Sequence, residues 1–141
     1  MESQASVQVR RYRPEDEDQV VDLWMRCGLV VPQNDPRRDI QAKMSWQPEL
    51  FLIGAVGDRV VATTMVGYEG HRGWINYLAV SPDLQRQGIG GMMMKEAERR
   101  LRELGCPKIN LQVRASNSAV IEFYERIGFE VDDVVSLGMR L

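Results

Sequence analysis

Gln85-Arg86-Gln87-Gly88-Ile89-Gly90-Gly91 is the stretch that decides the fold, and it lies near the centre of residues 74–104. The apolar run at 75–80 before it predicts a strand. Apolar residues recur after it at the spacing of an amphipathic helix: Ile89, Met93, Ala97, Leu101 and Leu104. A glycine loop between a strand and a helix can hold an anion, because phosphate can approach the glycine backbone and the first helical N–H groups have no intrahelical partner. We therefore expect residues 85–91 to bind a phosphate group.

Length and composition predict one globular domain over residues 1–141. The chain is 44% apolar and 27% charged, with a formal net charge of −2, so it lacks the basic excess typical of nucleic-acid-binding proteins. Its polar first residues and short apolar runs predict neither export nor a membrane partner, which makes the cytoplasm the expected location. Cys27, Cys106 and the single His71 do not have metal-ligand spacing, so no metal is expected.

Periodicity and turn residues predict the remaining elements. Helices are expected from Arg13-Pro14 to about Cys27, after the Asp35-Pro36 pair, and from Ser116-Asn117 to Gly128. Further strands are expected at 7–12, 50–56, 60–68, 108–113, 129–135 and 136–141. This order of strands and helices predicts an α+β fold, with a mixed sheet covered by helices.

The spacing of the glycines excludes two common phosphate loops. A P-loop would place Gly-Lys-Ser/Thr at the helix start, but Met92 follows Gly91. A dinucleotide fingerprint would need a third glycine where the chain has Met93. The pattern Gln/Arg-x-x-Gly-x-Gly/Ala remains, and residues 85–90 match it at every defined position.

That pattern resembles the acetyl-CoA pyrophosphate loop of the GNAT (Gcn5-related N-acetyltransferase) superfamily. Residues 78–90 are similar to the family's passage from strand 4 to helix 3, and residues 111–117 with 123–129 to its passage from strand 5 to helix 4. Three segments are also similar to a small bacterial branch of the YpeA type: 31–36, 67–73 and 136–138. The resemblance implies a seven-stranded, largely antiparallel sheet with about four flanking helices. It also implies a bulge in strand 4 that splays this strand from strand 5.

The resemblance further implies transfer of an acetyl group from acetyl-CoA directly to an amine, either on a small molecule or on a peptide or protein. Acetyl-CoA would be the co-substrate, and a homodimer is left open. The backbone N–H near Leu78 would stabilise the oxyanion, and the Tyr124 hydroxyl would protonate the thiolate as general acid. The residues expected at the co-substrate are Leu78, Ala79, Val80, Gln85, Arg86, Gln87, Gly88, Ile89, Gly90, Gly91, Asn117 and Tyr124.

The general base stays open at this stage. Several family members carry a glutamate on strand 4, where this chain has Trp74, Asn76 and Tyr77, and one branch has glutamate where this chain has Gln112. The remaining candidates are Glu69, Asp35, His71 or a water chain ending on one of them. Because only a neutral amine can attack, positioning with deprotonation by solvent can also suffice.

The acceptor is expected beside the two N-terminal helices and residues 29–35. Asn34, Asp35 and Glu69 could hold a cationic amine, and four aromatic residues could form apolar walls: Trp24, Trp46, Tyr68 and Trp74. A second hypothesis, from another class, is a CoA-binding regulatory or interaction domain that has lost turnover. The glutamine at 112 favours this alternative, whereas Tyr124 opposes it.

Overall fold

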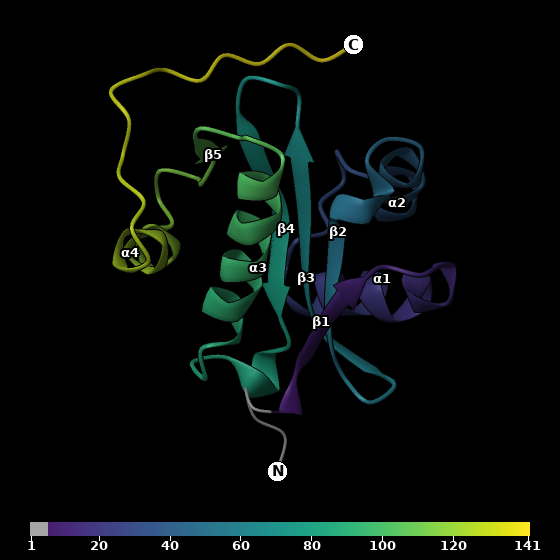
Figure 1. The fold of residues 1–141 in the computed structure, drawn as a ribbon. Coiled ribbons are helices and arrows are strands. Elements are labelled where there is room, and N and C mark those ends of the chain that lie inside the picture. The colour runs from purple at the N-terminus through teal and green to yellow at the C-terminus, as the bar shows by residue number, and fades with distance from the viewer. Residues whose placement is uncertain (1–5) are drawn as a thin grey trace. The chain divides into compact units, whose positions relative to one another are not determined.

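The computed structural model describes residues 6–141. The chain divides into two compact units, the first ending at Leu111 and the second comprising Gln112–Leu141, and each is described by itself. The regular elements, labelled in Figure 1, are β1 (Gln8–Arg11), α1 (Glu17–Arg26), α2 (Pro36–Met44), β2 (Phe51–Val56), β3 (Arg59–Tyr68), β4 (Gly73–Val80), α3 (Ile89–Glu103), β5 (Ile109–Leu111) and α4 (Ser118–Arg126). Short 3-10 helices occur at Pro14–Asp16, Pro48–Leu50 and Pro82–Leu84.

The first unit contains a five-stranded sheet in the order β1-β2-β3-β4-β5. The first four strands pair antiparallel, and β5 pairs parallel with β4. Gly57, with a φ of 56°, turns the chain between β2 and β3 in the left-handed conformation that glycine adopts readily. The prediction of an α+β fold with a mixed sheet is therefore confirmed.

Helix α3 packs on one face of the sheet, against β2, β3 and β4. A Cβ atom built on Gly54 would lie 3.0 Å from Met93 Sδ, and one on Gly73 would lie 2.8 Å from Leu101 Cδ1. The two glycines thus let the helix approach the sheet closely. Four residues of the predicted stripe are buried: Ile89, Met93, Ala97 and Leu101. The fifth, Leu104, is 52% exposed because it follows the last residue of the helix.

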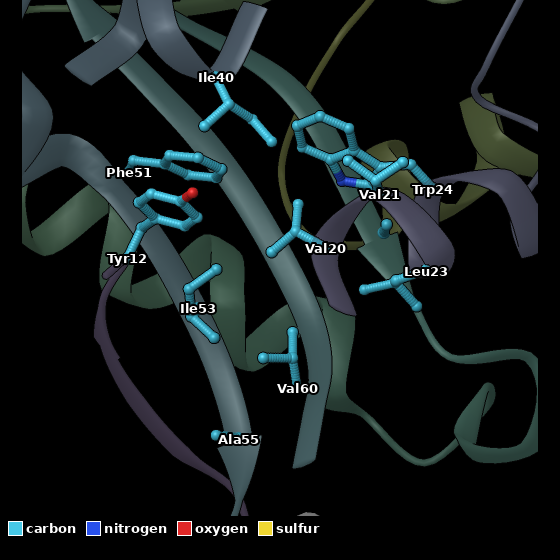
Figure 2. Packing of buried hydrophobic residues seen from close by; sticks show 11 residues of the cluster. Tyr12, Val20, Val21, Leu23, Trp24, Ile40, Phe51, Ile53, Ala55 and Val60 are labelled. Atoms are coloured by element: carbon cyan, nitrogen blue, oxygen red, sulfur yellow. The ribbon is translucent and has the colours of Figure 1, made fainter. Parts of the chain in front are cut away.

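The opposite face carries the main hydrophobic core, shared with α1 and α2 (Figure 2). Phe51 stacks on Tyr12 with the ring centroids 4.5 Å apart, and its ring lies 6.2 Å from that of Trp24. Trp24 is fully buried. Ile40 brings α2 into the same cluster, so both N-terminal helices are fixed to the sheet by apolar burial.

The predicted strands at 129–135 and 136–141 are wrong, and the count of seven is corrected to five. Among residues 6–141 no strand follows β5, and the apolar side chains of this segment are exposed: Val131, Val134, Val135, Leu137 and Met139. Apolar alternation predicts a strand but cannot tell whether a partner strand is available to pair with it. Glu130, Asp132 and Asp133 interrupt the apolar pattern with residue types that are depleted in strands.

Candidate functional site

Strand β4 contains a bulge at Tyr77 and Leu78. Thr63 pairs with Ala79, whereas Met65 pairs with Asn76, so two residues of β4 stand opposite the single residue between Thr63 and Met65. Tyr77 has a φ of 53°, in the left-handed region that a non-glycine residue adopts only at a cost in free energy. The bulge implied by the family resemblance is thus present, at the expected place.

Beyond the bulge, β4 has an edge that pairs with no strand among residues 6–111. The β4–β5 pairing covers only Gly73 to Ile75. The N–H of Ser81 donates to Val61 on β3 at 2.8 Å, so the backbone groups of the preceding residue, Val80, point to the opposite side. The Val80 carbonyl accepts from Gln85 Nε2 at 3.1 Å and from the Cys27 thiol at 3.3 Å. The chain itself therefore engages this carbonyl, on the edge of β4 that faces away from β3.

Three side chains hold Tyr77. Its ring stacks on Trp24 with the centroids 3.7 Å apart, and its hydroxyl donates to Asp39 Oδ2 at 2.6 Å. The Thr63 hydroxyl donates to the Tyr77 carbonyl at 2.7 Å and accepts from Trp24 Nε1 at 2.8 Å. Burial and the hydrogen bond to Asp39 raise the pKa of the Tyr77 phenol. The sequence analysis missed Thr63 and Asp39, which lie 14 and 38 residues from Tyr77 and belong to no local motif.

The glycine loop connects the 3-10 helix after β4 to α3. Arg86 and Gly88 both have positive φ, 66° and 82°. Gly88 is the N-cap of α3 without a side-chain hydrogen bond to the helix, and the first turn of α3 contains no acidic residue. Alternating backbone conformations of this kind form a concave arrangement of N–H groups, which suits an anion. A Cβ on Gly91 would meet no atom within 4 Å, so there is space beside the first turn.

A polar network supports the start of this loop. Ser81 is fully buried, and its hydroxyl accepts from Arg26 at 2.9 Å and from Arg59 at 3.2 Å. Arg59 also donates to Asp83 at 2.9 and 3.0 Å. Hydrogen bonds from Ser81 and Arg59 lower the pKa of Asp83. The network connects the loop to α1 and β3. The sequence Ser81-Pro82-Asp83 alone predicts only the end of a strand and gives no sign of these contacts.

The second unit contains the two other residues expected at the co-substrate. Asn117 is the N-cap of α4, and its side chain accepts from the Val120 N–H at 3.4 Å. Tyr124 is 8% exposed, with its ring centroid 5.1 Å from that of Phe123 and 5.4 Å from that of Phe129. Burial raises the pKa of the Tyr124 phenol to about 12, so the hydroxyl keeps its proton at neutral pH.

The candidate bases and acceptor residues lie in turns and caps. Glu69 accepts hydrogen bonds from the N–H groups of His71 and Arg72 in the exposed β3–β4 turn. Strand β4 starts just after this turn, and Leu78 follows roughly 15 Å further along it at about 3.3 Å per residue. Asp35 caps α2 by accepting from the next two N–H groups, at 3.1 and 3.3 Å. Asn34 is exposed in the preceding turn. The structure therefore does not bring Glu69 and Leu78 together.

The four aromatic residues that were expected to form apolar walls of the acceptor site differ in how far they are buried. Trp24 belongs to the core, whereas Trp46 is 67% and Trp74 39% exposed. Tyr68 is half-buried beside the β3–β4 turn and donates to the Gly70 carbonyl at 3.2 Å. Trp46 and Trp74 are thus the members of this group with surface to offer a ligand.

Two further findings concern residues 6–141 as a whole. None of their helices has both the length and the apolar character needed to cross a membrane. Within the same range, His, Cys, Asp and Glu side chains form no group of three or more that could hold a metal ion.

Comparison with known proteins gives the family. The model of the acetyltransferase (GNAT) family matches residues 17–129. The chain is 45% identical over 136 residues to the protein named Acetyltransferase SG1711 of Sodalis glossinidius, covering 96% of both chains. Among solved structures, Ard1 from Thermoplasma volcanium has a TM-score of 0.81 at 23% identity, covering 90% of this chain and 84% of that one. The PaiA N-acetyltransferase of Thermoplasma acidophilum, solved in complex with coenzyme A, has a TM-score of 0.71 at 18% identity, covering 92% and 93%.

The chain belongs to the GNAT acetyltransferase family. As a member of this family it is an acetyl-CoA-dependent N-acetyltransferase. The resemblance on which the sequence analysis relied is therefore confirmed for the family, whereas membership of the YpeA-type branch, a single domain over 1–141 and a homodimer stay predictions.

Proposed function

We propose that this enzyme transfers acetyl from acetyl-CoA directly to an amine of a small molecule or of an exposed peptide, with residues 78–91 as the binding site for the co-substrate. The observation that carries the proposal is that the part of β4 without a β5 partner leads directly into the glycine loop at 85–91. Strand β4 loses its β5 partner after Ile75, bulges at Tyr77, and leads through one 3-10 turn into the loop that starts α3.

The loop would hold the pyrophosphate. The proposal places the pyrophosphate at the start of a 15-residue helix, where the helix dipole adds a partial positive charge. The space beside Gly91 supports this assignment, because a phosphate oxygen must approach the backbone closely. Acetyl-CoA is the acetyl donor, and its thioester is the bond that is broken.

The edge of β4 would hold the pantetheine arm in the manner of an added strand. Leu78 has no register partner in β3 or β5, and its N–H is the proposed donor to the thioester carbonyl oxygen. In the reaction the amine nitrogen forms a bond to the acetyl carbon while the carbon–sulfur bond breaks. The N–H of Leu78 would stabilise the negative charge that develops on the carbonyl oxygen.

Tyr124 is proposed as the general acid that gives its proton to the leaving thiolate. The role requires a hydroxyl that carries a proton, and a phenol with a pKa of about 12 is protonated at every pH at which the enzyme is expected to work. Asn117 is proposed as a further contact of the co-substrate. Its side chain is engaged as an N-cap, so this contact would use the amide nitrogen that the cap leaves available.

Strand β4 contains no Asp or Glu, so the proton of the attacking amine needs another acceptor. Glu69 stays a candidate base, but its engagement in the turn and its separation from Leu78 favour solvent as the acceptor. Asn34 and Asp35 at the start of α2 are proposed to attract a cationic amine, with Asp35 acting through charge because it also caps the helix.

An amine panel tests the function. The purified protein is incubated with acetyl-CoA and with small primary amines, polyamines and peptides with free N-termini, and released thiol and N-acetylated product are both quantified. The proposal predicts thiol release that depends on at least one amine, matched by an equal amount of acetylated product. Thermal stabilisation by CoA without thiol release from any amine would instead support the CoA-binding regulatory domain, and the absence of stabilisation would contradict both readings.

A further inference from the structure

We propose that Thr63 and Asp39 are positioning residues, which fix the peptide between Tyr77 and Leu78 and thereby aim the Leu78 N–H at the acetyl carbonyl. This inference rests on the acetyl-transfer function proposed above and adds two residues to it. Neither side chain belongs to the glycine loop or to α4, and neither is proposed to touch the reacting atoms.

Thr63 acts on the peptide directly. The carbonyl of Tyr77 and the N–H of Leu78 belong to one planar peptide unit, and the described residues contain no cis peptide bond. In a trans peptide the carbonyl and the N–H point in opposite directions. Because the Thr63 hydroxyl bonds the Tyr77 carbonyl at 2.7 Å, the Leu78 N–H must point away from Thr63, on the opposite side of the peptide. A rotation of this peptide would move the N–H away from its target.

The Thr63 hydroxyl is itself fixed. It is fully buried, and it accepts the Trp24 Nε1–H at 2.8 Å, which leaves its own proton to point at the Tyr77 carbonyl. Trp24 is 0% exposed in the core of α1 and cannot shift without disrupting that core. The orientation of the peptide is therefore linked to the buried core that contains Trp24.

Asp39 acts at the other end of Tyr77. Its carboxylate accepts the phenol proton at 2.6 Å, and the Tyr77 ring lies 3.7 Å from Trp24 at an interplanar angle of 12°. Together these contacts hold the side chain between α2 and α1. They offset the cost of the left-handed φ at Tyr77, which would otherwise favour an extended backbone and a different direction for the next N–H.

The test compares four variants by steady-state kinetics, CoA affinity and NMR. Thr63→Val removes the hydroxyl, whereas Thr63→Ser keeps a hydroxyl at this position. Tyr77→Phe keeps the ring stack and removes the bond to Asp39, so it decides the question if Thr63→Val fails to fold. Tyr12→Phe is the matched control, because it removes a phenol hydroxyl from the same core cluster.

We expect Thr63→Val to lower kcat about 10- to 100-fold, as for a misplaced oxyanion donor, and Tyr77→Phe to lower it by a smaller factor. KM for acetyl-CoA and Kd for CoA should change by less than about twofold, since the glycine loop is unaffected. Thr63→Ser should recover most of the rate, and Tyr12→Phe should keep the wild-type rate. The 13C shifts of Tyr77 and the Leu78 amide resonance should change in Thr63→Val but not in Tyr12→Phe.

A wild-type kcat in both Thr63→Val and Tyr77→Phe would overturn the inference. So would unchanged Tyr77 and Leu78 resonances in Thr63→Val, whatever the rate, or an equal loss of rate in Tyr12→Phe. Failure of the proposed function has a different signature, because wild-type protein would then release no thiol with any amine. The resonances of Tyr77 and Leu78 would still decide whether Thr63 sets the orientation of the peptide.

Discussion

The Thr63 hydroxyl donates to the carbonyl of Tyr77 across the bulge of β4, and this 2.7 Å bond connects a buried core to the proposed oxyanion donor. The next residue, Thr64, is equally buried, but its hydroxyl has no hydrogen-bond partner in the described part of the chain. The two adjacent threonines are buried on opposite faces of the sheet, and of the two hydroxyls only that of Thr63 has a hydrogen-bond partner among the described residues.

This contrast predicts opposite effects on stability. Thr63→Val should lower the free energy of unfolding by about 2 kcal/mol, because it leaves the Trp24 N–H buried without an acceptor. Thr64→Val removes an unsatisfied hydroxyl at nearly constant volume and should raise stability by up to about 1 kcal/mol. Urea unfolding of both variants measures the two values. Equal changes, or changes of the reverse sign, would contradict the assignment of the two hydroxyls.

The left-handed glycine at the start of α3 predicts a selective loss of CoA binding. Gly88→Ala should lower stability by about 1–2 kcal/mol through backbone strain. It should also weaken CoA binding about tenfold or more, since one displaced N–H donor to a charged group is worth about 1.5–3 kcal/mol. Titration calorimetry with CoA measures the affinity.

Gly57→Ala is the matched control for this prediction. Gly57 also has a positive φ, in the β2–β3 turn, and an added Cβ there meets no atom within 4 Å. It should lose a similar amount of stability while CoA binds as in the wild type. If both variants lose CoA affinity equally, strain rather than the loop is responsible.

Whether a feature of the fold or of the candidate site could be predicted from the sequence depends on how far apart its residues lie in the chain. The β4–loop–α3 passage was predicted because a strand, a glycine spacing and a helical stripe are all read within about 30 residues. The contacts of Trp24 with Thr63 and of Tyr77 with Asp39 join positions 39 and 38 residues apart, and no local pattern encodes them. The error at 129–141 has a related cause, because apolar alternation does not supply a strand partner.

Tyr124→Phe should lower kcat about 100-fold or more while Kd for CoA changes by less than about twofold, because only the proton donor is lost. Since burial raises the pKa of Tyr124 to about 12, the phenol should cause no alkaline fall in kcat below about pH 10. A full pH–rate profile checks both statements. A rate unchanged by Tyr124→Phe would remove this residue from the acid role.

The ion pair between Arg10 and Asp16 predicts a pH-dependent stability. Burial alone would raise the pKa of Asp16, but hydrogen bonds from Arg10 and from the Arg13 N–H outweigh burial and lower it. A lowered pKa stabilises the folded state fully above the unfolded value of about 3.9, and this contribution is lost as the pH falls through the folded value. Asp16→Asn should therefore cost about 2 kcal/mol at pH 7 and progressively less below about pH 4.

Asp22→Asn provides the control for that prediction. Asp22 pairs with Arg26 at 2.9 Å on the surface of α1, where its side chain is 66% exposed, so its removal should cost less than about 0.5 kcal/mol. Urea unfolding of both variants at pH 7 and pH 3 gives the comparison. A loss for Asp16→Asn that is the same at both pH values would show that packing, not charge, is the cause.

The central claim is that residues 85–91 hold the phosphates of acetyl-CoA, and stepwise ligands test it most directly. The affinities of pantetheine, 4′-phosphopantetheine and CoA are measured by titration calorimetry on the same protein. We predict that the first phosphate strengthens binding about 10- to 100-fold, equivalent to about one charged hydrogen bond, and that CoA binds tighter still. Equal affinities for pantetheine and phosphopantetheine would contradict the claim.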